Sequence, residues 1–451
     1  MKKLVSFVLS IMLILAISAG YAAEKPGTAS TRTDLLKNVS HMKQSTIRME
    51  ANGKVIYFDP VWLDNAVGDA DIIFVSHTHG DHFSIADIKK IMKKGAMLVV
   101  PADGAEAAQK EGITGILSVK PNKSYVVGGI RFKTVPAYNV NKAFHPKSSN
   151  WVGYIVEANN ASYYFAGDTD VIPEMKSFKA DVAFLPVGGT YTMNAQEAIE
   201  AAKLIKPAVA VPIHFGDIVG TTDDAMSFIK GLDKGMNGVL LKDLLSGVSL
   251  GKQSTIRIQG GKTVYFDPIG IAGEPKDADL IFISHSHGDH FSVEDIKKLV
   301  KPETVLVLPT DCVKPVVDAG LTNILTVGQG KNYELEGIKF SAVPAYNTNK
   351  QFHKKESNWV GYIVNLNGAS YYFAGDTDNI PEMKDIKANV AFLPVGGTYT
   401  MTAQEAAEAA NIMKPVIAVP IHYGSGIVGT PEDGAGFVKG LDPAIKGVLL
   451  K

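Results

Sequence analysis

A dense group of metal-binding side chains lies in the segment VSHTHGDHFS at residues 75–84. His77, His79, Asp81 and His82 fall within six positions of one another. In an extended chain, residues two apart point to the same side, so His77 and His79 aim together. Imidazole nitrogens and carboxylate oxygens are the ligands that suit zinc and neighbouring first-row metals. A lone histidine is ordinarily structural, but this cluster predicts a metal site.

The cluster occurs twice, because residues 283–292 read ISHSHGDHFS. Of the eleven histidines, ten form five pairs: His77 with His285, His79 with His287, His82 with His290, His145 with His353, and His214 with His422. The sequence has diverged around His145 and His353, so the retention of both histidines indicates a function. Only His41 lacks a counterpart, and we expect it at the surface.

The chain is a tandem duplication of a 209-residue unit, at residues 34–242 and 243–451. DLLKNVSHMKQSTIR opens the first unit, DLLSGVSLGKQSTIR opens the second, and GVLLK closes both. Each unit is long enough to form a domain with its own core. Because the junction over residues 243–251 is short, we expect the domains to pack as a pseudo-dimer, through equivalent surfaces related by a pseudo-two-fold axis.

Each unit reads as hairpins followed by strands mixed with helices. The turn Asn52-Gly53 predicts a hairpin, and ADIIFVS predicts a buried strand that leads into the histidine cluster. Ser84, with Asp87 three residues on, predicts the start of a helix over residues 85–94. Such an order favours an α/β fold with two sheets covered by helices on the outside.

With these motifs the chain resembles the metallo-β-lactamase superfamily, over residues 45–214 and 254–422. The resemblance is carried by H-x-H-x-D-H, by a Gly-Asp pair after a strand, and by a late strand that ends in histidine. The segments IYFDP, FAGDTD, FLPVGGTYTM and VPIHFG look like the branch of metal-dependent hydrolases that includes the L-ascorbate-6-phosphate lactonases. The resemblance implies an αββα sandwich in two tandem domains, with metals at one edge.

The resemblance also implies a role for each ligand. In the first unit, the first metal would be bound by His77 and His79, the second by Asp81, His82 and His214, and both by Asp168. In the second unit the same roles fall on His285, His287, Asp289, His290, His422 and Asp376. We expect two divalent ions per domain, zinc with manganese or iron as alternatives, to hold a bridging hydroxide that attacks the substrate. Asp81 and Asp289 are the expected catalytic residues.

The chain departs from the family pattern at one position. The family usually has a histidine where Asn139 and Asn347 stand, and here a histidine follows six residues later, at His145 and His353. Either this histidine returns to the first metal, which we favour, or it meets the substrate. Asp59 and its counterpart Asp267 either orient the ligands or are simple turn residues.

Several other side chains near the motifs recur in both units and could line a pocket or serve in packing. They are Tyr138, Lys142, Trp151 and Tyr191, which recur at Tyr346, Lys350, Trp359 and Tyr399. A lysine in a pocket could meet an anionic group, whereas on the surface it would only be solvated. The single cysteine, Cys312, lies outside every motif and is interpreted as incidental.

These features favour a hydrolase that acts on an ester, lactone or phosphoester bond of a small molecule. The alternatives are a non-catalytic metal-binding or scaffold protein on a retired hydrolase fold, and a phosphodiesterase or nuclease. A net charge of −1 in 451 residues gives no basic footprint, so we expect no nucleic-acid partner.

The N-terminal segment has the shape of a secretory signal. Lysines precede an apolar stretch at residues 4–17, and small residues follow. We expect a signal peptide at residues 1–23, a short linker at 24–33, and export to the periplasm or the extracellular space without stable membrane association. The alternative is an uncleaved anchor, although the apolar run is shorter than the ~20 residues that a spanning helix needs.

Overall fold

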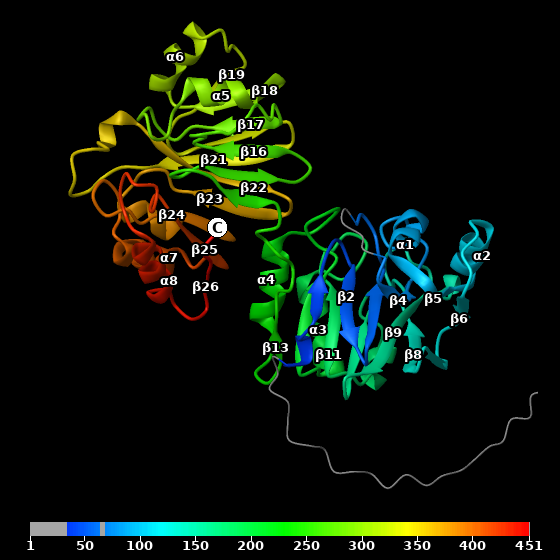
Figure 1. Cartoon of the computed structure of the whole chain (residues 1–451). Helices are drawn as coiled ribbons and strands as arrows, with labels where there is room; N and C mark the ends of the chain where they lie inside the picture. Colours follow the sequence, from blue (N-terminus) through cyan, green and yellow to red (C-terminus); the bar gives the residue numbers. More distant parts are fainter. Residues whose placement is uncertain (1–33, 64–67, 451) are drawn as a thin grey trace, which may run out of the picture.

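The computed structural model describes residues 34–63 and 68–450. Within this range the chain forms two lobes, and each lobe contains a six-stranded and a seven-stranded sheet (Figure 1). The predicted signal peptide and linker lie outside the described residues. None of the helices in the described part of the chain is long and apolar enough to cross a membrane.

The strands of the first unit follow one another in sequential order within each sheet. The six-stranded sheet runs β1 (Val39–His41), β2 (Ile47–Ala51), β3 (Lys54–Phe58), β4 (Ala70–Phe74), β5 (Met92–Pro101) and β6 (Ile116–Val119). The seven-stranded sheet contains β7 (Ser124–Val127), β8 (Ile130–Pro136), β9 (Val152–Ala158), β10 (Ala161–Phe165), β11 (Val182–Pro186), β12 (Val209–Ile213) and β13 (Asn237–Gly238). The helices are α1 (Ile85–Ile91), α2 (Ala102–Lys110), α3 (Ala195–Ile205) and α4 (Thr222–Gly231).

The second unit repeats this arrangement. Its six-stranded sheet contains β14 (Val248–Leu250), β15 (Ile256–Gln259), β16 (Thr263–Phe266), β17 (Ala278–Phe282), β18 (Val300–Leu308) and β19 (Ile324–Thr326). Its seven-stranded sheet contains β20 (Lys331–Leu335), β21 (Ile338–Pro344), β22 (Val360–Leu366), β23 (Ala369–Phe373), β24 (Val390–Pro394), β25 (Ile417–Ile421) and β26 (Lys446–Gly447). The helices are α5 (Val293–Leu299), α6 (Val313–Asp318), α7 (Ala403–Met413) and α8 (Pro431–Lys439).

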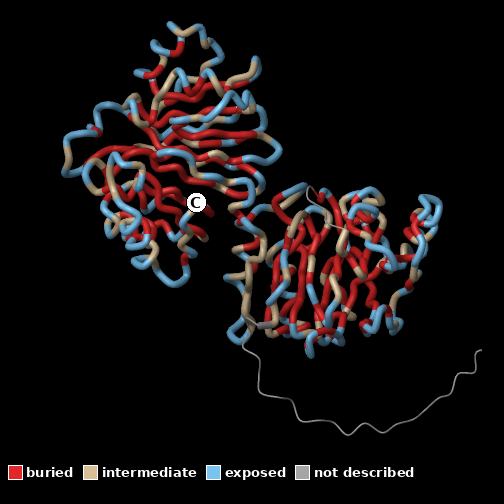
Figure 2. Tube along the Cα trace, in the orientation of Figure 1, coloured by how far each residue is buried: buried red, intermediate tan, exposed pale blue. Residues whose placement is uncertain are grey.

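Three layers of apolar side chains hold each unit together, and Figure 2 shows the buried residues concentrated along the strands. In the first unit the central layer lies between the sheets and contains a stack of Phe58 on Phe74 and on Phe165. A second layer joins α1 and α2 to the six-stranded sheet, and a third joins α3 and α4 to the other sheet. This is the expected αββα sandwich, present twice.

The local predictions were largely confirmed. Asn52 and Gly53 both have positive φ angles, as the hairpin turn requires. The Ser84 side chain accepts a hydrogen bond from the Asp87 amide at the start of α1. The predicted helix over residues 85–94 is too long, however, because it ends at Ile91. Met92 already belongs to β5, where it pairs with Ala70 of β4, so sheet pairing outweighs helix propensity there.

Strand direction explains why the motifs of each unit lie close together in space. In each sheet, an antiparallel part is followed by a parallel part that contains β3 to β6 or β10 to β13. The carboxyl ends of parallel strands lie at one edge of a sheet, where ligands bind in such folds. Asp59 follows β3, His77 follows β4, Asp168 follows β10 and His214 follows β12. Sequence segments far apart are thereby brought to one edge of the sandwich.

Candidate metal centre

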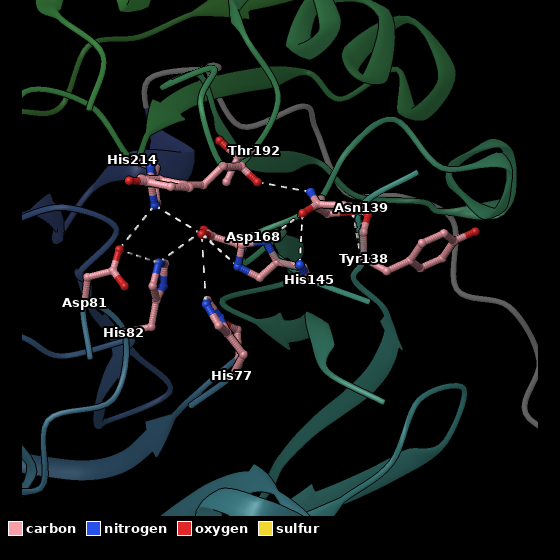
Figure 3. Close-up of polar contacts among 12 residues, drawn as sticks. His77, Asp81, His82, Tyr138, Asn139, His145, Asp168, Thr192 and His214 are labelled. Carbon is pink, nitrogen blue, oxygen red and sulfur yellow. Dashed lines mark hydrogen bonds and ion pairs between the residues drawn. The ribbon is translucent and has the colours of Figure 1, made fainter. Parts of the chain in front are cut away.

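The first unit gathers its predicted ligands into two adjacent clusters, and Figure 3 labels all of these ligands except His79. One cluster contains His77, His79 and His145, and the other contains Asp81, His82, Asp168 and His214. Within each cluster the potential ligand atoms all lie within 4.8 Å of one another. Of these residues, only His79 and Asp81 are more than slightly exposed. The sequence predicted every member of both clusters.

Asp168 lies between the two clusters. Its Oδ2 is 3.3 Å from His145 Nε2 and 3.2 Å from His214 Nε2, and its Oδ1 is 3.2 Å from His82 Nε2. A carboxylate in this position can contact a cation on either side. This placement follows from the Gly167 turn after β10, where φ is 62° and a Cβ would press against Ser76.

The arrangement recurs in the second unit. His285, His287 and His353 form one cluster with ligand atoms within 4.8 Å. Asp376 lies 3.1 Å from His290 Nε2, 3.3 Å from His353 Nε2 and 3.3 Å from His422 Nε2. Asp289 is 3.6 Å from His422 Nε2. Each unit therefore supplies a full set of candidate ligands from its own chain segment.

The buried ligand atoms lack partners in a way that fits a cation. Among the described residues, no hydrogen bond is formed by the buried Nε2 atoms of His77, His82, His145, His285, His290 and His353, or by the Oδ1 atoms of Asp168 and Asp376. Some of these atoms nevertheless lie close together, such as His82 Nε2 and Asp168 Oδ1 at 3.2 Å. Buried polar atoms ordinarily find a partner, since leaving one unpaired costs roughly 1–3 kcal/mol. In each unit these atoms converge on one place, so the set of ligand atoms fits divalent metal ions.

Asn139 has a clear structural role, although it departs from the family pattern. Its Oδ1 accepts hydrogen bonds at 3.0 Å from the backbone N–H and from Nδ1 of His145. Its Nδ2 donates to Asp170 Oδ1 at 3.1 Å and to the Tyr191 carbonyl at 3.0 Å. These bonds fix the amide orientation, so the proton of His145 lies on Nδ1 and Nε2 faces the first cluster. His145 thus returns to the histidine pair, and Asn347 holds His353 in the same way.

Asp59 orients two other ligands and is not a simple turn residue. It is fully buried, and its Oδ2 lies 2.7 Å from Nδ1 of His82 and 2.6 Å from the Ser76 hydroxyl. That hydroxyl in turn lies 2.9 Å from Nδ1 of His77. Both histidines are therefore held by Nδ1, which leaves Nε2 directed at the centre. Asp267 has the same contacts in the second unit.

The electrostatics differ between the clusters. Burial lowers the pKa of His77 well below its usual value and lowers the pKa of His145 to about 4, so both rings are neutral and can offer a lone pair. Burial would also lower the pKa of His214, but the Asp168 and Asp81 carboxylates outweigh it and raise that pKa to about 9. The carboxylates of the second cluster thus favour a positive charge beside them.

Two residues near the centre were missed or misplaced from the sequence. Gln44 is fully buried, and its Nε2 lies 3.0 Å from both Asp81 Oδ2 and His214 Nε2. Its only sequence signal is its recurrence as Gln253, which makes the same contacts. The expectation that His41 lies at the surface is wrong: it is 4% exposed, and its Nε2 contacts the Gln44 carbonyl at 2.7 Å.

The other recurring side chains fall into two groups. The Trp151 ring packs on the rings of His77 and His79, with centroids 5.0 and 4.8 Å apart, and its Nε1 donates to Asp103. By contrast, the Lys142 ammonium is bound to Asp170 at 2.6 Å, and it is not a free cation in a pocket.

Tyr138 also points away from the ligands (Figure 3), because its hydroxyl donates to Glu174. Tyr191 contacts the exposed ring of Phe144 edge to face at 4.7 Å and contributes its carbonyl to Asn139. Cys312, which directly precedes α6, is buried in an apolar layer of the second unit.

A protein-family profile described as "Beta-lactamase superfamily domain" matches residues 38–214 and again residues 249–422. The chain therefore belongs to this superfamily, as two tandem domains of the metallo-β-lactamase fold. It is similar to the UPF0173 metal-dependent hydrolase of Methanopyrus kandleri, with 29% identity over 44% of this chain and 91% of the relative. It is 32% identical to the UPF0173 metal-dependent hydrolase of Pyrococcus abyssi, over 43% of this chain and 91% of the relative. The chain is thus a metal-dependent hydrolase of this superfamily.

Solved structures also match one unit of the chain. A structure described as a metal-dependent hydrolase from Parabacteroides distasonis is 29% identical, with 45% of this chain and 91% of that chain covered and a TM-score of 0.39. The metallo-hydrolase Igni18 from Ignicoccus hospitalis is 21% identical, with coverage of 46% and 95% and a TM-score of 0.39.

Proposed function

We propose that each unit binds two divalent ions, zinc with manganese or iron as alternatives, and hydrolyses an ester, lactone or phosphoester bond of a small molecule. The observation that carries this proposal is the convergence of unpaired buried ligand atoms from two clusters on either side of Asp168. When bound, two such metal ions supply a hydroxide at neutral pH and polarise the bond under attack.

The residues of the chain divide the work of holding these ions. His77, His79 and His145 would hold the first ion, and Asp81, His82 and His214 the second, with Asp168 between them. Asn139, Ser76 and Asp59 fix the imidazole tautomers, so that no ring must reorient before it binds. The ring of Trp151 packs on the rings of His77 and His79.

We propose also that the protein is exported, with the signal segment at residues 1–23 removed. The support is the lysine start, the apolar stretch and the small residues after it. N-terminal sequencing of protein from cells tests this proposal. A mature chain that begins near Tyr21 to Glu24 is expected, and an intact Met1 on a membrane-bound form would instead support an anchor.

A substrate panel combined with metal removal tests the hydrolase assignment. The full chain would be assayed with generic esters, lactones, phosphodiesters and single-stranded nucleic acid, before and after treatment with a chelator. We expect turnover of a small ester or lactone that is lost with the metal and restored by its return. Tight metal binding without turnover of any substrate would favour a scaffold protein, and cleavage of nucleic acid alone would favour a nuclease.

A further inference from the structure

The two units touch through different surfaces. The Thr222 backbone N–H and side-chain hydroxyl, at the start of α4, both donate to the Gly368 carbonyl at 2.9 Å. Gly368 belongs to the turn between β22 and β23 of the second unit. Nearby, Asn389 Nδ2 donates to Asp223 Oδ1 at 2.9 Å. These contacts differ from the expected pairing of equivalent surfaces about a pseudo-two-fold axis.

At each contact position the two units carry different residues. These residues allow α4 of the first unit to contact the second unit, but they do not allow the reverse contact. Gly368 corresponds to Asn160 in the first unit. A Cβ at Gly368 would overlap the backbone of Gly216, and its φ of 73° also favours glycine. The turn of the second unit therefore fits against the first unit because it lacks a side chain. Asn160 is exposed.

The other two contact positions show the same asymmetry. Asn389 is 5% exposed and corresponds to Asp181, which is exposed. A carboxylate at position 389, as in Asp181, would face Asp223 with like charge. Thr222 is 1% exposed and corresponds to Pro431, which is exposed and has no N–H to donate. The surfaces left free on each unit thus lack the groups that make the contact.

We propose that α4 of the first unit and the β22–β23 turn of the second form a fixed contact within one chain, specified by Gly368, Asn389 and Thr222. A contact between non-equivalent surfaces can propagate into rings or filaments when the free surfaces match. Here the free surfaces carry Pro431 and Asp181, so the contact does not repeat from chain to chain.

The contact also supports one metal centre and not the other. Gly216, against which Gly368 packs, lies two residues after His214. The corresponding segment of the second unit, which follows His422, has no such neighbour among the described contacts. The second unit therefore braces the loop that positions a ligand of the first unit. This last step rests on the proposed function, whereas the contact itself does not.

Hydrogen exchange of the full chain, measured by mass spectrometry, tests the contact without metal or substrate. In Gly368→Asn, exchange over residues 215–224 should rise by roughly tenfold, because two hydrogen bonds to Thr222 are lost. Exchange over residues 424–433 should stay unchanged and serves as an internal control. The matched variant Asn160→Gly alters the equivalent turn of the first unit and should change neither segment.

Asn389→Asp provides a second variant of almost identical shape. It places a carboxylate against Asp223 and should also raise exchange over residues 215–224, less so in 1 M salt, where charges are screened over about 3 Å. Asp181→Asn is its control and should have no effect. Unchanged exchange in both Gly368→Asn and Asn389→Asp, or equal effects of the control variants, would overturn the proposal. So would a head-to-tail oligomer in light scattering that Gly368→Asn dissociates.

Discussion

At the scale of single residues, the centre depends on side chains that aim the ligands as much as on the ligands themselves. Asp59 accepts from His82 directly and holds His77 through Ser76. Asn139 does the same for His145 through Nδ1. In each case the hydrogen bond selects the tautomer that leaves Nε2 free. The chain thus reaches a complete histidine cluster although asparagine stands at the position where the family usually has a ligand.

The substitution Asp59→Asn tests this role. The amide NH2 would face either the protonated Nδ1 of His82, which opposes the preferred tautomer, or the backbone N–H of Ser76, which then loses its acceptor. We expect metal affinity in the first unit to fall about 10- to 100-fold, as for other partners of metal-bound histidine. Competition with a chromophoric chelator measures this affinity.

The second unit provides the control for that experiment. Asp267→Asn should lower the metal affinity of the second unit by a similar factor and leave that of the first unit unchanged, because each unit has its own hydrogen-bond network. An affinity in Asp59→Asn equal to that of the unchanged chain would contradict the assigned role.

Residue types and spacing predicted the ligands, but they did not predict their supports. H-x-H-x-D-H is specific because all its members lie in one short segment. His145 was left open because its position depends on the loop conformation that Asn139 and Asp170 impose, which spacing does not reveal. Gln44 carried no chemical signal in the sequence, since a lone glutamine after a lysine is typical of a surface. Its burial against Asp81 follows only from the tertiary structure.

At the scale of elements, strand ends place the ligands and short helices hold the loops behind them. Asp87, in the first turn of α1, accepts from the backbone N–H of Trp62 at 2.9 Å and pairs with Lys90 at 2.9 Å. It thereby ties the loop that follows Asp59 to the helix that follows the histidine cluster. The capping pattern of Ser84 and Asp87 indicated this helix but not its end, because sheet pairing, and not local helix propensity, decides where β5 begins.

This tie predicts a pH dependence of stability. Burial opposes ionisation of Asp87, but Lys90, Ser84 and the Trp62 amide outweigh it and lower its pKa. A carboxyl whose pKa is lower in the folded state stabilises the fold above its unfolded value near 4, and this contribution is lost as the pH falls. Asp87→Asn should therefore cost about 1 kcal/mol of unfolding free energy at neutral pH, and the difference should shrink towards pH 3. Denaturant unfolding at several pH values measures it, and a pH-independent difference would refute the tie.

At the scale of the whole molecule, the chain carries two centres that are complete on their own. The repeat was evident from the sequence, because the motifs recur in the same order 208 or 209 residues further along the chain. The packing of the two units was not evident from the sequence. The contact depends on three positions where the units differ: Gly368, Asn389 and Thr222. Sequence identity between the units favoured a two-fold pairing, whereas the differences between them specify the contact found.

Independent centres should be silenced independently. Asp81→Ala and Asp289→Ala each remove a predicted ligand of the second ion from one unit, so each should abolish the turnover of that unit and leave the other. The double variant should lose all turnover of the substrate found in the panel. Steady-state rates of the two single variants and the double variant provide the comparison. Turnover that survives the double change would place the chemistry elsewhere.

Metal stoichiometry tests the central claim most directly. Elemental analysis of the full chain, after dialysis with excess zinc or manganese and removal of unbound ions, should give about four ions per chain, two for each unit. Asp168→Ala should lower the content of the first unit alone, and Asp376→Ala that of the second. About two ions per chain would mean that one cluster in each unit does not hold a metal. Fewer than one ion per chain would contradict the assignment of these clusters as metal centres.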